Sequence, residues 1–243
     1  MVGNRLHLAY QPKVCLADRE MMGAEALCRR TDAELDVVSP AEFIPMAERS
    51  SVISNLGGLV IEMVIQDLLA WRRRGLALPA IAVNVSAKQL QTAGSVDWLG
   101  GLVAPARAEP DQPRDRVDRR RADGAQRGQS QILAELVGPG FRISVDDFGT
   151  GYSSLAYLKR MPISELKVDH SFVRNLAEDQ GDQAIAAAIL TLAHTRKLSV
   201  VAEGVEDEHQ LAVLQKLHCD AAQGYYFHKP LEPAMFSALL PRV

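Results

Sequence analysis

The sequence predicts an α/β fold whose strands close into a (β/α)8 barrel, and three observations support this. Short apolar runs alternate with helical patterns along the chain, as in folds built from βα units. Polar residues follow these runs, and the carboxyl ends of successive barrel strands bring such residues to one mouth. The 243 residues are close to the ~250 of a typical single barrel. On periodicity alone, an open Rossmann-like sheet remains the alternative.

Five short apolar runs are the candidate strands. Runs of this kind are typical of strands buried on both faces, so we expect a parallel sheet. The runs are Ala80 to Val83 before Asn84, Ile143 to Val145 before Asp146 and Asp147, Leu166 to Val168 before Asp169, Val200 to Ala202 before Glu203, and Gly224 to Phe227 after Gln223.

Three amphipathic patterns lie between these runs and predict helices over Leu59 to Arg73, Gln183 to Arg196 and Asp207 to Leu217. Neither a GxGxxG after the first strand nor a GxxxxGK[ST] occurs in the sequence. The absence of both motifs argues against dinucleotide and P-loop chemistry.

Composition and charge limit the classes of partner and the cell compartment that we expect for this chain. The net charge of −3 and a pI near 6.1 predict neither a nucleic-acid polymer nor an anionic membrane as partner. Three cysteines without CxxC spacing indicate no disulfide framework or thiolate metal site, so we expect a cytoplasmic protein. The longest uncharged stretches, 75–87 and 183–195, are shorter than the ~18 apolar residues of a membrane span, and the first residues lack a signal-peptide core.

The polar residues near the strand ends form an acidic, oxygen-rich set. Such ligands suit hard cations, Mg²⁺ or Mn²⁺, better than Zn²⁺. Adjacent Asp146 and Asp147 can both reach the mouth only where the strand ends and the chain turns, and the following GTGYSS supplies a turn. The set is Glu25, Asn84, Asp146, Asp147, Lys167, Asp169, Glu203 and Gln223.

Several motifs, all in the family's order, resemble those of EAL domains, phosphodiesterases that hydrolyse cyclic di-GMP. The matching segments are YQP at 10–12, GAEALCR at 23–29, PAEFIPMAE at 40–48, AVNVSAKQL at 82–90, DDFGTGYSSLAYLKRMP at 146–162, LKVDHSFVRNL at 166–176, VVAEGVE at 200–206 and QGYYFHKPL at 223–231. This resemblance implies a TIM-like (β/α)8 barrel with one strand reversed, which binds the cyclic dinucleotide across its mouth. Two Mg²⁺ or Mn²⁺ ions would activate a water for in-line attack, giving linear pGpG.

The resemblance also implies roles for individual residues. The metal ligands would be Glu25, Asn84, Asp146 and Asp147, the last shared between the ions and therefore counted with the catalytic residues. Lys167 would position or polarise the water, and Glu203 would order it or take its proton. The remaining roles are ligand contacts at Gln11, Arg29, Gln223 and Pro230, and support of the DDFGTG loop by Thr150, Gly151 and Glu206.

Two of these positions have simpler interpretations, and two others depart from the family. Lys167 could be a buried amine that neutralises the acidic cluster, and Arg29 could belong to an ion pair in the barrel stem. Arg30 stands where the family usually has tryptophan, and Cys28 where it usually has an aliphatic residue. These two departures affect packing or the guanine platform more than the chemistry.

The segment from 104 to 131 breaks the pattern. Its 28 residues include seven Arg, five Asp or Glu and a single large apolar residue, Val117. A buried strand is excluded, because each buried unpaired charge costs several kcal/mol against a total stability of ~5–15 kcal/mol. In the family a strand with an ExTE pattern lies here, and its glutamates should fall near Arg116 and Arg119. A paired frame slip in the gene, with length preserved, and natural divergence are both open explanations.

These observations leave three hypotheses for a single domain over 1–243, related to a longer multidomain signalling protein. The chain is an EAL phosphodiesterase, intact or impaired by loss of the ExTE glutamates. Alternatively it is a degenerate EAL domain that binds cyclic di-GMP or a protein partner without catalysis. A third possibility is a misassembled barrel in which a missing strand leaves two edges unpaired. The resemblance to the family also suggests a homodimer and an upstream sensory or GGDEF-type domain in a longer parent protein.

Two structural expectations follow. The carboxylates at 25, 146, 147 and 203 should converge with Asn84 and Lys167 at one mouth. The segment 104–131 should be exposed or poorly ordered and should supply no metal ligand.

Overall fold

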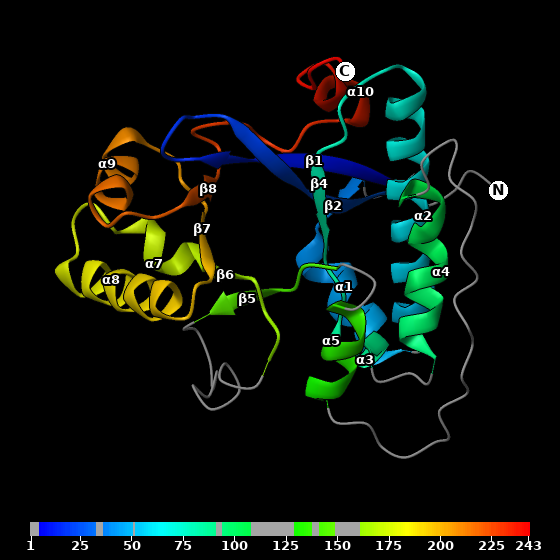
Figure 1. The fold of residues 1–243 in the computed structure, drawn as a ribbon, viewed down its shortest axis with the longest axis horizontal. Coiled ribbons are helices and arrows are strands. Elements are labelled where there is room, and N and C mark those ends of the chain that lie inside the picture. Colours follow the sequence, from blue (N-terminus) through cyan, green and yellow to red (C-terminus); the bar gives the residue numbers. More distant parts are fainter. Residues whose placement is uncertain are drawn as a thin grey trace.

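A computed structural model of the chain describes residues 5–32, 36–50, 52–90, 94–107, 129–137, 141–148 and 161–243. All eight strands join one curled sheet in the order β3-β2-β1-β8-β7-β6-β5, with β4 paired to β2 (Figure 1). The predicted α/β fold and TIM-like barrel are confirmed. The strands are β1 (Arg5–Cys15), β2 (Met21–Asp32), β3 (Asp36–Val38), β4 (Ala80–Val83), β5 (Ser144–Phe148), β6 (Glu165–Val168), β7 (Ser199–Glu203) and β8 (Ala221–Gln223).

One strand at the centre of the sheet runs against its neighbours. β1 is antiparallel to both β2 and β8, whereas β4 is parallel to β2, and β5 to β8 form parallel pairs. The reversed strand implied by the family resemblance is therefore present, and the prediction of a wholly parallel sheet is wrong for β1 and for β3. The reason is that residues 16–20 join β1 to β2 as a short hairpin turn, which leaves no room for a crossover helix.

Helices cover the outside of the sheet, and side chains cap several of them. Asp207 accepts a hydrogen bond from the backbone N–H of Gln210 and forms a capping box, and Asp179 caps the preceding long helix. All three predicted helices are confirmed with shifted ends. The helices are α1 (Pro40–Arg49), α2 (Val52–Arg73), α3 (Ala87–Leu90), α4 (Ser95–Arg107), α5 (Gln129–Val137), α7 (His170–Arg174), α8 (Gln180–Thr195), α9 (Glu208–Lys216) and α10 (Pro233–Ser237).

The predicted strand from Gly224 to Phe227 is wrong, because β8 ends at Gln223 and a turn follows. The turn brings Gly224 against the backbone of Val205, where an added Cβ would meet the carbonyl oxygen at 2.1 Å. Tyr225 and Tyr226 are exposed, so their apolar character reflects a surface turn and not a buried strand. The preceding apolar pair, Ala221 and Ala222, is the buried strand.

The prediction for residues 104–131 is corrected in part. The chain continues helix α4 as far as Arg107, and α5 begins at Gln129, so both ends of the segment are helical. The intervening residues 108–128, with Arg116 and Arg119, lie outside the described residues.

The sheet has two free borders within the described part of the chain. There, β4 pairs only with β2, and β5 pairs only with β6. The described strands β4 and β5 therefore do not pair with each other.

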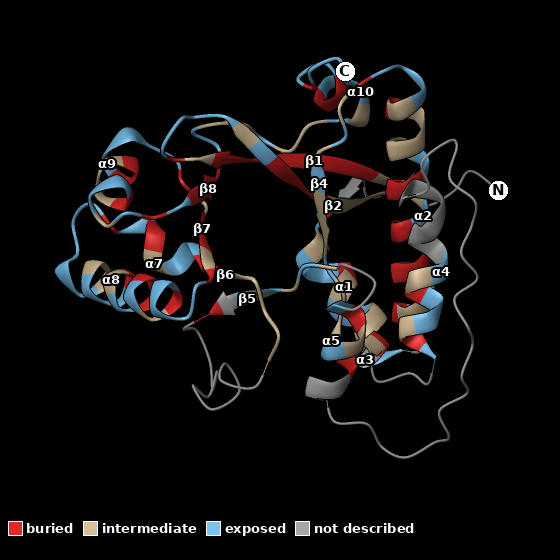
Figure 2. Ribbon diagram, viewed as in Figure 1, coloured by how far each residue is buried: buried red, intermediate tan, exposed pale blue. Residues whose placement is uncertain are grey.

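Apolar packing divides the molecule into two halves (Figure 2). The first half comprises β1–β4, α1–α5 and α10, with a core that includes Leu8, Tyr10, Val64 and Trp71. The second half comprises β5–β8 and α7–α9, with a core around Leu166, Val200 and Leu214. These two largest clusters share no residue. Along the strands, the residues between these core positions point into the barrel.

Residues 231–243 return to the first half. Leu231 exchanges backbone hydrogen bonds with Tyr10, at 2.7 and 2.9 Å, and Phe236 of α10 packs against the rings of Tyr10 and Trp71. The chain then pairs Arg242 with Leu76. The first core is thus completed by the C-terminal segment.

Helix α2 has the length and hydropathy of a membrane span, by composition alone. Of its buried residues, Val60 and Val64 belong to the core of the first half, and Ile61 belongs to a third, smaller cluster with residues of α4 and α5. Its Asp67 accepts a hydrogen bond from the hydroxyl of Tyr10 at 2.7 Å. The buried core helix of a soluble protein satisfies the same test.

We expect Gly224→Ala to destabilise the protein, because the new methyl group would collide with backbone atoms of Val205, which cannot move aside as a side chain can. The expected loss in the free energy of unfolding is about 3 kcal/mol, at the upper end for overpacking. Urea titration followed by circular dichroism measures it. Gly100→Ala in α4 is the matched control, since nothing lies within 4 Å of its added Cβ, and a helical glycine-to-alanine change should stabilise. Equal stability of Gly224→Ala and the parent would contradict the prediction.

Candidate active site

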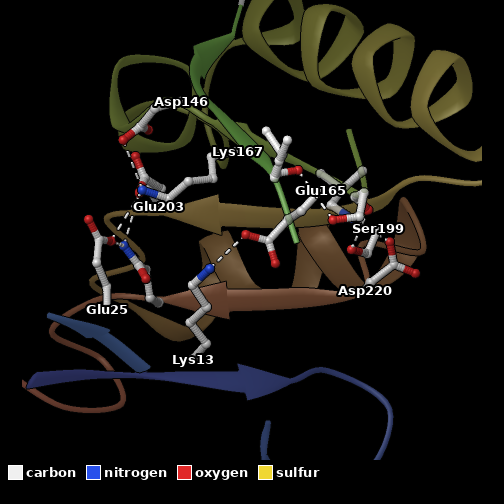
Figure 3. A network of polar contacts seen from close by, with 12 residues as sticks. Lys13, Glu25, Asp146, Glu165, Lys167, Ser199, Glu203 and Asp220 are labelled. Atoms are coloured by element: carbon white, nitrogen blue, oxygen red, sulfur yellow. Dashed lines mark hydrogen bonds and ion pairs between the residues drawn. The ribbon is translucent and has the colours of Figure 1, made fainter. Parts of the chain in front are cut away.

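The centre of the candidate site is the ammonium group of Lys167, on β6 inside the barrel. Its Nζ lies 3.2 Å from Oε2 of Glu25 and 3.1 Å from Oδ2 of Asp146, and it also contacts Oε1 of Glu203 (Figure 3). The Lys167 side chain is only 5 % exposed. Strands β2, β5 and β7 thus each send one carboxylate to the same ammonium on β6.

Three side chains contact the carboxylate of Glu25, which lies on β2. Asn84, the first residue after β4, donates from Nδ2 to Oε1 at 2.7 Å, and Gln223 donates from Nε2 to Oε2 at 2.7 Å. With Lys167, these contacts use both oxygens of a buried carboxylate. Glu25 lies in the middle of β2 and not at a strand end as predicted, because β2 runs on beyond the mouth to pair with β3.

Gln223 links Glu25 to Glu203. Its Nε2 also donates to Oε1 of Glu203 at 2.9 Å, and the register of β7 and β8 places the two residues directly opposite one another. Glu203 is the last residue of β7, as predicted. Gln223 is the last residue of β8, whereas the sequence placed it before a strand from Gly224 to Phe227. Oε1 of Gln223 is buried and has no hydrogen-bond partner in the described structure.

Asp146 reaches the site through an irregularity in β5. Val145 pairs with Leu166 and Phe148 with Val168, so β5 contains one residue more than β6 between these pairs. The strand runs on to Phe148, so the expectation that it ends at Asp146 and Asp147 is wrong, and the bulge carries Asp146. The turn predicted after it lies outside the described residues. The side chain of Asp147, predicted as the shared ligand, lies outside the described residues.

The electrostatics of the cluster differ from residue to residue. Burial lowers the pKa of Lys167, but the three carboxylates outweigh it and raise that pKa above its ordinary value. Burial raises the pKa of Glu25, yet Lys167, Gln223 and Asn84 together bring it below the usual range. Burial, with Asp146 and Glu25 nearby, raises the pKa of Glu203 to about 7 despite the opposing effect of Lys167.

The cluster is accessible from one side. The side chain of Asp146 is 43 % exposed and Asn84 is exposed, whereas Glu25, Lys167 and Gln223 are buried. Three carboxylates around one ammonium leave an excess of negative charge at this open side when all are ionised. Such a site attracts cations.

Three of the residues predicted to contact the ligand lie in two separate places, one near the start of the C-terminal segment and one on β2. Gln11 follows Tyr10 on β1 and donates from Nε2 to the carbonyl of His228 at 3.2 Å, which secures the loop that contains Pro230. Gln11 and Pro230 are neighbours through the backbone pairing of Tyr10 with Leu231. Arg29 lies further along β2 and donates to the carbonyl of Cys28 at 3.1 Å.

The predicted loop support is not placed by the structure. Thr150 and Gly151 lie outside the described residues. Glu206 is exposed, and its backbone N–H donates to Oε1 of Gln210 at 2.7 Å. Its role toward the DDFGTG loop stays a prediction.

The sequence and the fold both match known proteins. The model of the EAL domain family matches residues 1–230. The chain belongs to the EAL domain family. The Pseudomonas aeruginosa protein MucR, a bifunctional diguanylate cyclase/cyclic di-GMP phosphodiesterase, is 40% identical over 227 residues, which are 93% of this chain and 33% of MucR. The cyclic di-GMP phosphodiesterase NbdA of the same organism is 37% identical over 246 residues, 98% of this chain and 30% of NbdA. This EAL domain spans about a third of the length of these curated relatives.

Solved EAL structures share the fold. The phosphodiesterase of PaMucR in its c-di-GMP complex superposes with a TM-score of 0.82 at 37% identity, over 95% of this chain and 94% of that chain. The EAL domain of Mycobacterium smegmatis DcpA superposes with a TM-score of 0.74 at 28% identity, over 98% and 97% of the two chains.

The residues of this EAL domain fit a hard divalent cation, although the described ranges contain no three His, Cys, Asp or Glu side chains spaced as ligands of one metal ion. The donors at the mouth are carboxylate and amide oxygens, as Mg²⁺ and Mn²⁺ prefer. The unpartnered acceptor Oε1 of Gln223 agrees with a site that accepts a further ligand or its water. The carboxylates here surround the ammonium of Lys167, which holds them together by charge.

Sequence reasoning missed a second polar layer in the barrel of this EAL domain. Lys13 on β1 and Glu165, the first residue of β6, form an ion pair of 2.6 Å between Nζ and Oε1 (Figure 3). Glu165 lies two residues before Lys167 and therefore on the same face of β6. That spacing was the available signal, since a charged residue two positions from a lumen lysine also points into the barrel.

We expect Lys167→Met to lower the free energy of unfolding by about 3–5 kcal/mol at pH 7.5 in EDTA, because it leaves buried carboxylates without their cation. Their folded pKa values would then rise above the unfolded ones, so stability is lost as the pH rises and regained as it falls toward 5. Denaturant titrations between pH 5 and 8 measure this slope. The exposed Lys216→Met serves as control and should change stability little at any pH. If the loss in the free energy of unfolding caused by Lys167→Met does not vary with pH, the electrostatic explanation is wrong.

Proposed function

We propose that this EAL domain is a metal-dependent phosphodiesterase that hydrolyses cyclic di-GMP to linear pGpG. The observation that carries the proposal is the convergence of Glu25, Asp146 and Glu203 on Lys167 at an open, negatively charged mouth. The likeness to the c-di-GMP complex of PaMucR, whose fold this chain shares over nearly its full length, supports the same substrate.

Glu25, Asn84 and Asp146, together with Asp147, would hold Mg²⁺ or Mn²⁺. When bound, two such ions stabilise the attacking and the leaving oxygen of an in-line displacement and lower the pKa of a bound water. This division of labour accounts for the three carboxylates that surround Lys167 in the described part of the mouth.

The chain's own residues orient the water and move its proton. The ammonium of Lys167 donates a hydrogen bond toward the water oxygen and holds it in line with one phosphodiester. A carboxylate oxygen of Glu203, whose pKa is raised to about 7, accepts the water proton near neutral pH. A bond forms between the water oxygen and phosphorus, the bond to the 3′ oxygen breaks, and that oxygen takes up a proton to give pGpG.

The ligand is held by the loop that follows β8. Gln11 secures the carbonyl of His228, and Pro230 lies between that carbonyl and the backbone pair of Tyr10 and Leu231. A base of the cyclic dinucleotide would contact Pro230 and Gln11, while Arg29 would approach a phosphate or guanine. Gln223 would complete the water network beside Glu203.

A second candidate function is binding of cyclic di-GMP without turnover. The sequence observation that favours it is the absence of an ExTE pattern near Arg116 and Arg119. With one anionic ligand fewer, at least one cation site is weakened, and the charge that develops on the phosphoryl and leaving oxygens is only partly compensated. Binding then survives where turnover does not.

We expect the chain to hydrolyse cyclic di-GMP only with Mn²⁺ or Mg²⁺, and far more slowly than a version with the reading frame across codons 97–132 restored. Product assays for pGpG, beside binding titrations with and without Mn²⁺, measure turnover and affinity separately. Asp146→Asn in the restored version should abolish turnover and serves as the negative control. Equal, fast turnover by both versions would show that the missing glutamate is dispensable, and the impaired-enzyme proposal would be dropped.

A further inference from the structure

We propose that the ion pair of Lys13 and Glu165 is a positioning element that clamps the two halves of the barrel together and thereby sets the approach of Lys167 to Glu25. The pair lies in the lumen, outside the set of residues assigned to metal, water or substrate. Its catalytic consequence rests on the proposed function, whereas its effect on the arrangement of the two halves does not.

The first reason is that direct backbone pairing between the halves is short. In the described ladders, β1 and β8 share only two residue pairs, Val14 with Ala222 and Cys15 with Ala221. On the opposite side, the described strands β4 and β5 do not pair with each other. Next to this ladder, the backbone N–H of Leu16 donates to the carbonyl of Asp220 at 2.9 Å. Few backbone hydrogen bonds between the described strands thus oppose a rotation of the halves about β1 and β8.

The second reason is that the two large apolar cores do not resist this rotation. Leu16 is the only residue from the β1–β2 hairpin in the core of the second half, and the cores share no member. A smaller third cluster around Ile61, Leu99 and Leu133 of the first half also includes Phe141, Ile143 and Met161, which precede β5 and β6, so it joins the halves on the side of β4 and β5. It contains no residue of β1, β2, β7 or β8, and on the side of these four strands the lumen contacts therefore supply much of the connection.

The third reason is the place of the pair. In the strand order β1-β8-β7-β6, two strands separate Lys13 from Glu165, so their 2.6 Å contact crosses the lumen and not a neighbouring edge. Figure 3 shows Lys13 reaching up from β1 toward Glu165 while Lys167 occupies the next position along β6 toward the mouth. Both side chains are largely buried, with exposures of 7 % and 18 %, which strengthens their attraction.

The consequence concerns Lys167. Glu165 and Lys167 lie on the same face of the four-residue strand β6. The attraction between Glu165 and Lys13 of β1 therefore also sets the distance of Lys167 from β2. Glu25 lies on β2, and β2 is tied to β1 along ten residue pairs. The distance of 3.2 Å between Lys167 Nζ and Glu25 Oε2 thus depends on the Lys13–Glu165 contact beneath it.

The test measures the distance between the halves directly. Spin labels are attached at Gln66→Cys on α2 and Ala188→Cys on α8, two exposed positions in opposite halves. Pulsed electron paramagnetic resonance then measures the distance between them. The partly accessible native cysteines are removed by Cys15→Ser and Cys28→Ala. We expect Lys13→Met and Glu165→Gln each to shift or broaden the distance distribution. Lys13→Arg should keep it narrow, and Lys13→Glu together with Glu165→Lys should restore it. Tyr10→Phe, which removes a buried hydrogen bond within the first half, is the matched control and should leave it unchanged.

Kinetics provide a second measurement. In a version that turns over cyclic di-GMP with Mn²⁺, Glu165→Gln should lower kcat by about 100-fold, as a ~1 Å misplacement does, with KM nearly unchanged, and Lys13→Arg should recover most of kcat. Distance distributions of Lys13→Met and Glu165→Gln that superimpose on the parent's would overturn the proposal, whether or not the chain is active. Absence of pGpG with altered distributions would instead count against the proposed function alone. If Lys13→Met does not fold, Glu165→Gln decides, because it keeps the size of the side chain.

Discussion

The attraction between one buried ammonium and three carboxylates is the interaction on which this barrel depends. Lys167 contacts Glu25, Asp146 and Glu203 from three different strands. Glu25 belongs to the first half of the molecule, and the other two belong to the second. Removal of the ammonium would leave like charges facing one another in a poorly solvated lumen. The same contact therefore maintains the architecture and assembles the chemistry.

Bringing three carboxylates together also places like charges close to one another. Carboxylates packed this closely repel one another, and burial together with that repulsion raises the pKa of Glu203. Lys167 relieves the repulsion, while Asn84 and Gln223 use neutral amides to orient Glu25 without adding charge.

Much of the fold could be predicted, since β6, β7 and the long helices carry clear periodicity and lie in βα units. The hairpin of β1 and β2 could not, because its residues alternate between a polar lumen and an apolar outer face and therefore form no apolar run. Glu25 was placed among the polar residues near strand ends, and the family motif gave it the role of a metal ligand. Its position in mid-strand depends on how far β2 extends. The contact of Lys13 with Glu165 joins residues 152 positions apart. Spacing alone does not encode it.

The return of residues 231–243 to the first half has a consequence for synthesis. Phe236 and Leu240 complete the core around Tyr10 and Trp71, and Arg242 pairs with Leu76. During translation, the core of the first half therefore stays incomplete until residues 231–243 have been made, after the whole of the second half. A gene lesion that shifts the frame in the middle and never restores it would deprive the earliest strands of their final partners.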